Sequence, residues 1–255
     1  EISTRDWSSD VCSSDLWATD RVRRSAFSRG LDPVANRCID RVAPRVLHAH
    51  FGPDGAFALR TVRRRGLPLV VSFHGYDAVR PDSTFATRGG RFWLRHRSAV
   101  LAESAALLAN SDFVRAHLID LGADPERVHL HHLGVDTDAY APTPNRPAGR
   151  VLFVGRLAAV KGIEVAIRAM SLVARRHPDV RFTVVGDGPL REDMGRLACD
   201  LELEVAWRGA LAPSAVRDEL ARATLLLAPS TVSPEGQREA LGLSLVRSEE
   251  HTSEL

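Results

Sequence analysis

The sequence predicts an α/β protein with two Rossmann-like domains that face a cleft, each built on a parallel sheet. Short apolar stretches alternate with stretches that carry apolar residues at helical spacing, which is the pattern of repeated βαβ units. Three prolines and a glycine interrupt the alternation at 141–149, and it restarts after them. We therefore expect an N-terminal domain over 17–140, a linker over 141–149 and a C-terminal domain over 150–246.

The first half contains three expected strands and three expected helices. The strands are expected over 45–52, 68–75 and 127–134, and the helices over 55–66, 99–111 and 113–122. The run before His74 is continuously apolar, as in a strand buried on both faces of a parallel sheet.

The second half is expected to repeat strand and helix in strict alternation. Strands are expected over 150–156, 180–188, 204–209 and 224–230, and helices over 162–177, 189–201 and 213–223. Open α/β sheets bind ligands outside the carboxyl ends of their strands, so the loops after these strands are the first places to search for a site.

The two ends of the chain have a different origin from the rest. Residues 6–16 and 247–255 back-translate to opposite strands of one oligonucleotide, a short-read sequencing adapter. Two unrelated polar tails would not share this relation. We therefore interpret residues 1–16 and 247–255 as adapter-derived, exclude them from the fold, and expect the native part, Trp17–Val246, to be cut at both ends.

Composition narrows the class of protein. Outside the two ends the chain has 32 basic and 25 acidic residues, an excess that suits phosphate, nucleic acid or an anionic membrane face, or a merely solvated basic surface. Cys38 and Cys199 make neither a disulfide framework nor a zinc site, which favours a reducing compartment. Because no apolar run approaches about 20 residues, we expect a cytoplasmic protein, soluble or peripheral at the inner membrane face.

One basic residue is chemically distinct. Lys161 is the single lysine among 34 basic residues, so it marks a position where a compact ammonium is wanted, unless it survives by chance. It lies with Arg156 between a strand and a helix start, where free N–H groups favour an anion. The pattern indicates phosphate binding, although it is not a P-loop and a solvated loop with two charges is the alternative.

Three further motifs lie at expected strand ends. Gly186 and Gly188 form a tight turn, but Arg191 stands where a dinucleotide fingerprint needs a glycine, so NAD binding is not expected. Glu239 could accept hydrogen bonds from sugar hydroxyls beside a phosphate site, or be a surface residue. His74 could act as an acid or base at the cleft, or be structural.

Two histidine pairs have the spacing of a strand face. His48 and His50, and likewise His129 and His131, are two residues apart, but no Asp or Cys partner repeats nearby. We expect no metal site.

Taken together, the motifs resemble the retaining glycosyltransferases of family 4, which have the GT-B fold. HAHFGPDGAFALRTVRRRGLPLVVSFHGYD is similar to the centre of that family's first domain, and LLANSDFVRAHLIDLGADPERVHLHHLGVDTDAYAP to its end. RVLFVGRLAAVKG, FTVVGDGPL and EVAWRGAL are similar to the donor-binding domain. The resemblance covers nearly all of residues 17–246, and the ordered set is more specific than any one motif.

The resemblance implies a UDP- or GDP-sugar donor held largely by the second domain, without a metal or other cofactor. Arg156 and Lys161 match the pair that binds the diphosphate and neutralises charge on the leaving nucleotide. His74 and Glu239 match catalytic residues that approach the transferred sugar. The remaining donor-binding positions match turns near the nucleoside and phosphate: Gly186, Gly188, Gly209 and Leu211.

The implied activity is transfer of a sugar, with retained configuration, to a glycan or lipid-linked acceptor in bacterial envelope or exopolysaccharide synthesis. Contact with an anionic membrane is a further expectation, and nucleic acid is not an expected partner. A GT-B sugar-nucleotide epimerase and a non-catalytic sugar-nucleotide-binding module are the alternatives.

Two departures from the family pattern bear on activity. The family's first strand and glycine-rich loop would precede Trp17, so both domains are expected to be incomplete. The second glutamate of the family's E-x(7)-E motif would stand at Arg247. We therefore expect the 255-residue chain to be inactive and poorly stable.

Overall fold

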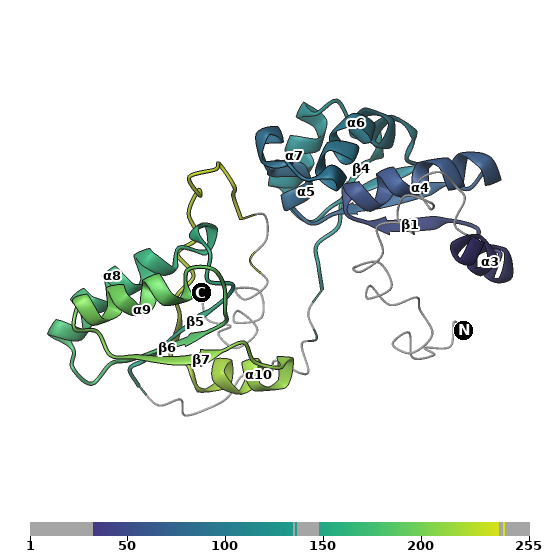
Figure 1. Cartoon of the computed structure of the whole chain (residues 1–255). Helices are drawn as coiled ribbons and strands as arrows, with labels where there is room; N and C mark the ends of the chain where they lie inside the picture. Colours follow the sequence, from purple (N-terminus) through teal and green to yellow (C-terminus); the bar gives the residue numbers. More distant parts are fainter. Residues whose placement is uncertain (1–32, 135, 137–147, 240–241, 243–255) are drawn as a thin grey trace. The chain divides into compact units, whose positions relative to one another are not determined.

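The computed structural model describes residues 33–134, 136, 148–239 and 242 (Figure 1). Two four-stranded parallel sheets and their helices form these residues, which confirms the predicted α/β class. The predicted adapter-derived ends lie outside the described residues, as does most of the predicted linker.

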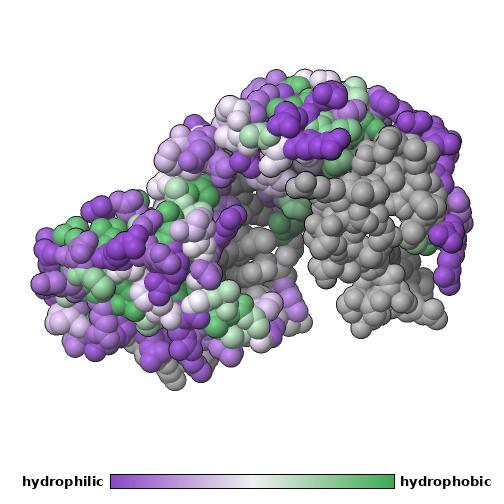
Figure 2. All heavy atoms as spheres, in the orientation of Figure 1, coloured by the Kyte–Doolittle hydropathy of each residue, from purple (hydrophilic) through white to green (hydrophobic). Residues whose placement is uncertain are grey.

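The described residues divide into two compact units. The first unit includes residues 33–73, 85–109 and 115–130. The second includes residues 74–84, 110–114 and the described residues from 131 onward. In the view of Figure 2, hydrophilic residues cover most of the described surface, and hydrophobic residues form patches among these hydrophilic residues.

The sheet of the first unit has the strand order β1-β2-β3-β4. Its strands are β1 (Leu47–His50), β2 (Leu69–Phe73), β3 (Ala106–Ala109) and β4 (Val128–Leu130). The helices along this part of the chain are α3 (Pro33–Val42), α4 (Gly52–Arg65), α5 (Tyr76–Val79), α6 (Arg88–Glu103) and α7 (Asp112–Asp120), with short 3₁₀ turns η1 (Asp82–Thr84) and η2 (Pro125–Arg127). Of these, α5 and η1 fall within the second unit.

Helix α4 packs closely against β2 and α6 through two glycines. A Cβ atom on Gly52 would lie 2.6 Å from the ring of Trp93, and one on Gly55 would lie 3.0 Å from Val71. Both neighbours are fully buried. A larger residue at either glycine would therefore push α4 away from the core.

The predicted helix over 99–111 is wrong in its second half. Helix α6 ends at Glu103, where the Ser104 hydroxyl donates to the Val100 carbonyl at 2.7 Å. The chain then joins the sheet, since the Ala105 N–H donates to the Leu69 carbonyl and β3 pairs with β2 from Ala106 onward. The helix also starts earlier than predicted, at Arg88, where the Thr87 hydroxyl accepts from the Gly90 N–H.

The sheet of the second unit has the order β7-β6-β5-β8 and is also parallel. Its strands are β5 (Arg150–Val154), β6 (Arg181–Val185), β7 (Val205–Gly209) and β8 (Leu225–Leu226). The helices are α8 (Ile163–Arg176), α9 (Arg191–Asp200) and α10 (Pro213–Arg222), with a 3₁₀ turn η4 (Ala159–Lys161) before α8.

Side chains alternate between the two faces of this second sheet, and both faces are covered. Phe153 packs into a core with Ile167 of α8 and Met194 of α9. The adjacent Leu152 points the other way, into a smaller core with Leu220 of α10. Helices on both faces of a parallel sheet make a doubly wound unit, whose strand ends are left free to bind ligands.

No helix among the described residues is long and apolar enough to cross a bilayer.

Candidate functional site

The candidate site lies at the carboxyl edge of the second sheet, where the segments after its strands are tied together by main-chain hydrogen bonds. The Leu157 N–H donates to the Asp187 carbonyl at 2.9 Å, and the Gly186 N–H donates to the Gly209 carbonyl at 2.8 Å. On the other side, the Thr231 N–H donates to the Val160 carbonyl at 3.0 Å. The loops therefore form one connected floor.

Two glycines allow this close approach. Gly162 has φ of 68°, and a Cβ atom there would lie 1.8 Å from the Pro229 carbonyl oxygen. Gly186 has φ of 131°, and a Cβ atom there would lie 1.9 Å from the Gly155 carbonyl oxygen. Neither position accepts a side chain without movement of the backbone. Gly162 was not among the predicted site residues, although its place between Lys161 and a helix start was visible in the sequence.

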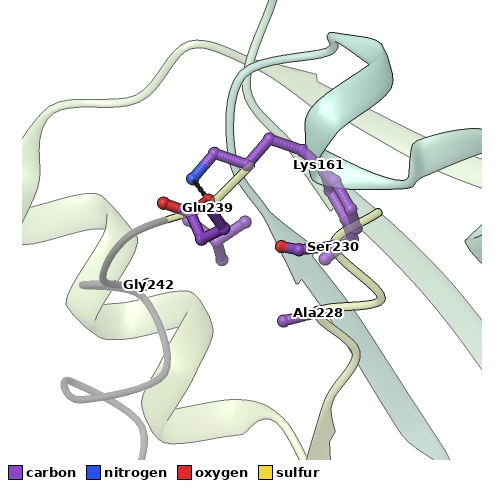
Figure 3. Close-up of a pocket in the computed structure, with 7 residues that line it drawn as sticks. Lys161, Ala228, Ser230, Glu239 and Gly242 are labelled. Carbon is purple, nitrogen blue, oxygen red and sulfur yellow. Dashed lines mark hydrogen bonds and ion pairs between the residues drawn. The ribbon is translucent and has the colours of Figure 1, made fainter. Parts of the chain in front are cut away.

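The structure brings together two of the predicted residues, Lys161 and Glu239 (Figure 3). The Lys161 ammonium donates to a Glu239 carboxylate oxygen across 78 positions of sequence. The two side chains are only 30% and 25% exposed, so solvent screens this ion pair less than an exposed one. Phe153, Ala228 and Ser230 line the same pocket.

Arg156 provides a second positive charge on the loop after β5. Its side chain is exposed, and it forms no ion pair with any residue that the structure describes. Lys161 is therefore neutralised by a carboxylate, whereas the Arg156 guanidinium is available to an anion from solution.

His74 follows the last residue of β2, as predicted. The backbone N–H groups of His74 and Gly75 both donate to one Asp77 carboxylate oxygen at 3.1 Å, and Asp77 is 1% exposed. This buried carboxylate fixes the turn that presents the imidazole. Within the second unit, His74 lines a cavity of about 180 Å³ together with Lys161 and Glu239.

The remaining predicted residues lie at the same sheet edge. Gly188 approaches the loop after β5 so closely that a Cβ atom would lie 2.6 Å from the Leu157 carbonyl oxygen. Gly209 ends β7. Leu211 packs, partly buried, against the core beneath α10. Their predicted contact with a donor stays a prediction.

Residues on the loop after β8 were missed by the sequence reasoning. The Thr231 hydroxyl donates to the Ala159 carbonyl at 3.0 Å, which ties this loop to the turn that carries Lys161. Ser230 lines the pocket beside Glu239. The sequence signal that could have identified them is the presence of two hydroxyl residues, Ser230 and Thr231, directly after the last apolar strand.

The histidine pairs form no metal centre among the described residues. The His48 and His50 rings lie 4.6 Å apart on β1, and His48 Nε2 lies 2.8 Å from the Ser72 hydroxyl. His129 lies on β4, whereas His131 follows its end. No group of three or more His, Cys, Asp or Glu side chains is placed to hold a metal in the described part of the chain.

Two family comparisons cover most of the chain. The sequence model of Glycosyltransferase Family 4 matches residues 12–139, and that of Glycosyl transferases group 1 matches residues 148–249.

Curated relatives include D-inositol 3-phosphate glycosyltransferases from several species. The protein from Kineococcus radiotolerans is 31% identical over 221 residues, which is 77% of this chain and 50% of that protein. The protein from Mycobacterium tuberculosis is 29% identical over 80% of this chain and 45% of its own length. The chain thus spans about half the length of the curated relatives it matches.

Solved structures share the fold at low sequence identity. HepE of Anabaena, solved with UDP, is 18% identical with a TM-score of 0.69, covering 87% of this chain and 62% of that protein. Sucrose-phosphate synthase of Thermosynechococcus elongatus is 19% identical with a TM-score of 0.68, covering 89% and 59%. These likenesses and the two parallel sheets confirm the GT-B fold. Because the first family model alone matches half of the sequence, the chain belongs to glycosyltransferase family 4.

Proposed function

We propose that the chain is part of a retaining glycosyltransferase that moves a sugar from a nucleoside-diphosphate sugar to a glycan or lipid-linked acceptor. The observation that carries the proposal is the Lys161–Glu239 ion pair, whose lysine shares the segment between β5 and α8 with the exposed Arg156, at the sheet edge where α/β proteins bind ligands. Solved structures of HepE hold UDP and UDP-glucose, which supports a donor of that chemical class. The product would belong to a bacterial envelope or exported polysaccharide.

In this mechanism the two cations hold the diphosphate. Arg156 grips phosphate oxygens with its planar guanidinium, and Lys161 adds a compact charge. The bond between the sugar and the diphosphate breaks with its electron pair on the phosphate oxygen, so both cations stabilise charge that develops in the transition state. Neither a metal nor another cofactor is needed for that neutralisation.

The sugar would lie toward Glu239 and His74. The carboxylate of Glu239 accepts hydrogen bonds from sugar hydroxyls, and the imidazole of His74 lies in the same cavity. The acceptor hydroxyl attacks on the face that the nucleotide leaves, which retains the anomeric configuration. Its proton passes to the departing phosphate oxygen.

The Glu239 carboxylate is paired with the Lys161 ammonium, the same group that the diphosphate would contact. Donor binding would exchange one anion for another on Lys161 and release Glu239 toward the sugar. The exchange keeps the half-buried ammonium paired in both states, which avoids the cost of an uncompensated charge.

Nucleotide binding tests the site directly. We expect UDP or GDP, and the corresponding sugar nucleotides, to bind the chain in titration calorimetry, and Arg156→Ala and Lys161→Ala each to weaken binding at least about tenfold. Arg175→Ala removes an exposed arginine of α8 and serves as the matched control, with unchanged affinity expected. The proposal fails if none of the four nucleotides binds, or if the three variants behave alike.

Product analysis separates transfer from the alternatives. A longer gene product that contains residues 17–246 is incubated with UDP- or GDP-sugars and an acceptor panel that includes an inositol phosphate, because curated relatives carry that acceptor in their names. A glycoside with retained anomeric configuration supports transfer. An altered sugar nucleotide indicates an epimerase, and binding without turnover indicates a non-catalytic module.

A further inference from the structure

Helices α4 and α6 of the first unit differ from the other long helices in charge. They carry two acidic residues, Asp54 and Glu103, against eight arginines: Arg60, Arg63, Arg64, Arg65, Arg88, Arg91, Arg95 and Arg97. By contrast, the three helices α8, α9 and α10 of the second unit hold seven arginines and six acidic residues. A genome-wide preference for arginine would raise both groups alike, so it does not explain the difference.

The two helices lie side by side and run in the same direction. The Phe57 and Phe92 rings stack 4.8 Å apart at 8°, and further along both helices the Arg63 guanidinium donates to the Glu103 carboxylate. The rings therefore mark adjacent outer positions of α4 and α6.

Helical spacing places arginines around this stacked pair. Arg60 and Arg64 follow Phe57 by three and seven residues, and Arg88 and Arg95 flank Phe92 by four and three, so all share its side of their helix. The opposite side of α4 holds Gly55 and is buried. We call this outer surface the basic face; it consists of Phe57, Arg60, Arg64, Arg88, Phe92 and Arg95.

Three arginines of the basic face form no side-chain interaction within the described part of the fold. Arg60, Arg88 and Arg95 are exposed, and none of the three forms a hydrogen bond or ion pair with a described residue through its side chain. The second unit contains both kinds of exposed arginine: Arg168 and Arg196 are paired with acidic residues of their own helices, whereas Arg175, Arg176 and Arg222 have no side-chain partner among the described residues. The basic face differs in that its arginines gather on two adjacent helices.

Arg88 also lies in the first turn of α6, which contains no acidic residue. A cation there opposes the helix dipole, which destabilises the start of the helix. A charge kept at such a cost fits a role outside the fold.

We infer that the basic face binds the surface of an anionic phospholipid membrane. Guanidinium groups spread over two adjacent helices can pair with many lipid phosphates at once, and the aromatic pair between them suits the polar–apolar boundary of a bilayer. A single-stranded nucleic acid is a poorer fit, because base stacking needs free ring faces and Phe92 is stacked against both Phe57 and His96. This inference does not rest on the proposed sugar transfer.

Vesicle sedimentation of the whole chain tests the inference. We expect binding to vesicles that contain phosphatidylglycerol, little binding to pure phosphatidylcholine, and loss of binding in high salt. Each basic residue near an anionic surface contributes about fivefold to the partition coefficient, so the triple variant Arg60→Gln, Arg88→Gln, Arg95→Gln should lose on the order of 100-fold.

A second triple variant removes the same charge elsewhere. Arg175→Gln, Arg176→Gln and Arg222→Gln change exposed arginines of α8 and α10, and this variant should sediment nearly as the parent does. Circular dichroism melting curves establish that both variants are folded. Equal losses in the two variants, equal binding to neutral and anionic vesicles, or binding to soluble heparin or RNA with none to anionic vesicles would each overturn the inference.

Discussion

Lys161 and Glu239 form an ion pair that a phosphate group would have to break. The carboxylate competes with the donor for the ammonium, and both side chains are partly shielded from water. Removing the negative charge should therefore make nucleotide binding easier while it removes a group that acts on the sugar.

This competition predicts opposite effects of one substitution. Glu239→Gln should tighten the binding of free UDP or GDP about fivefold, the equivalent of about 1 kcal/mol for one partly screened ion pair. Titration calorimetry measures the change, and Glu164→Gln, which removes the partner of Arg168 on α8, should leave the affinity unchanged. Weaker nucleotide binding in Glu239→Gln would argue against the competition.

Gly162 and Gly209 form a matched pair for testing the main-chain floor. Both have a left-handed backbone, with φ of 68° and 66°, but a Cβ atom at Gly209 meets nothing within 4 Å. Gly209→Ala should lower the free energy of unfolding by about 1–2 kcal/mol, the cost of the backbone conformation alone. Gly162→Ala should cost at least about 3 kcal/mol, because the new atom overlaps the Pro229 carbonyl.

Urea unfolding of both variants measures this difference. Equal losses of stability would mean that the loop after β8 can move away from Gly162 at little cost.

Single residues were partly predictable. Lys161 could be selected because its residue type is unique in the chain, and Glu239 because it follows a loop rich in turn residues. Their direct ion pair could not be predicted, since it depends on the parallel pairing of β8 with β5, which brings two distant segments to one sheet edge.

Among the elements, α4 and α6 are joined by the Arg63–Glu103 ion pair as well as by packing. The hydrogen bond from Arg63 holds the pKa of Glu103 below its ordinary value. A carboxyl group with a lowered pKa stabilises the fold above its unfolded pKa, near pH 4.3, and this contribution is lost as pH falls through the folded pKa. Both side chains are about half exposed, so solvent reduces the contribution to under about 1 kcal/mol.

Glu103→Gln should therefore destabilise the protein slightly at pH 7 and less at pH 3, because the charged contribution shrinks as pH falls through the lowered pKa of Glu103. Urea unfolding at the two pH values measures this, with Glu204→Gln, an exposed glutamate just before β7 that forms no ion pair with a described residue, as a control. A loss of the same size at both pH values would show that the glutamate acts through packing and not through its charge.

Strand β3 is an element whose type could not be predicted from its local sequence. Ala106–Ala109 is a short apolar run of alanine and leucine directly after a helix, and its local sequence suits either structure. Its pairing with both β2 and β4 decides the outcome, and that information lies in other parts of the chain. The strands with β-branched residues, such as Leu69–Phe73 and Arg150–Val154, were predicted correctly because local preference and pairing agree there.

For the whole molecule, positive charge gathers in two places with different expected partners. The diphosphate site is small and includes a carboxylate, whereas the basic face is broad and has few acidic residues. The class of fold was predictable from the alternation of elements, but the sequence did not indicate which surface holds the excess charge.

The two charged regions should act independently. The triple variant Arg60→Gln, Arg88→Gln, Arg95→Gln should bind UDP or GDP with parental affinity, and Lys161→Ala should bind anionic vesicles as the parent does. Calorimetry and vesicle sedimentation on the same protein samples test both halves. A variant that loses both activities would indicate one shared surface, or a folding defect that circular dichroism would reveal.

The main-chain floor of the candidate site also determines how much the sequence of its loops can change. Because its cross-loop contacts join N–H and carbonyl groups, most side chains on those loops can be exchanged without breaking them. Substitutions are then harmful mainly at a few glycines and charged residues, and are tolerated at the other positions of these loops. A sequence can therefore change widely on these loops while the scaffold stays the same, and two solved structures at 18–19% identity do share the fold, with TM-scores near 0.7.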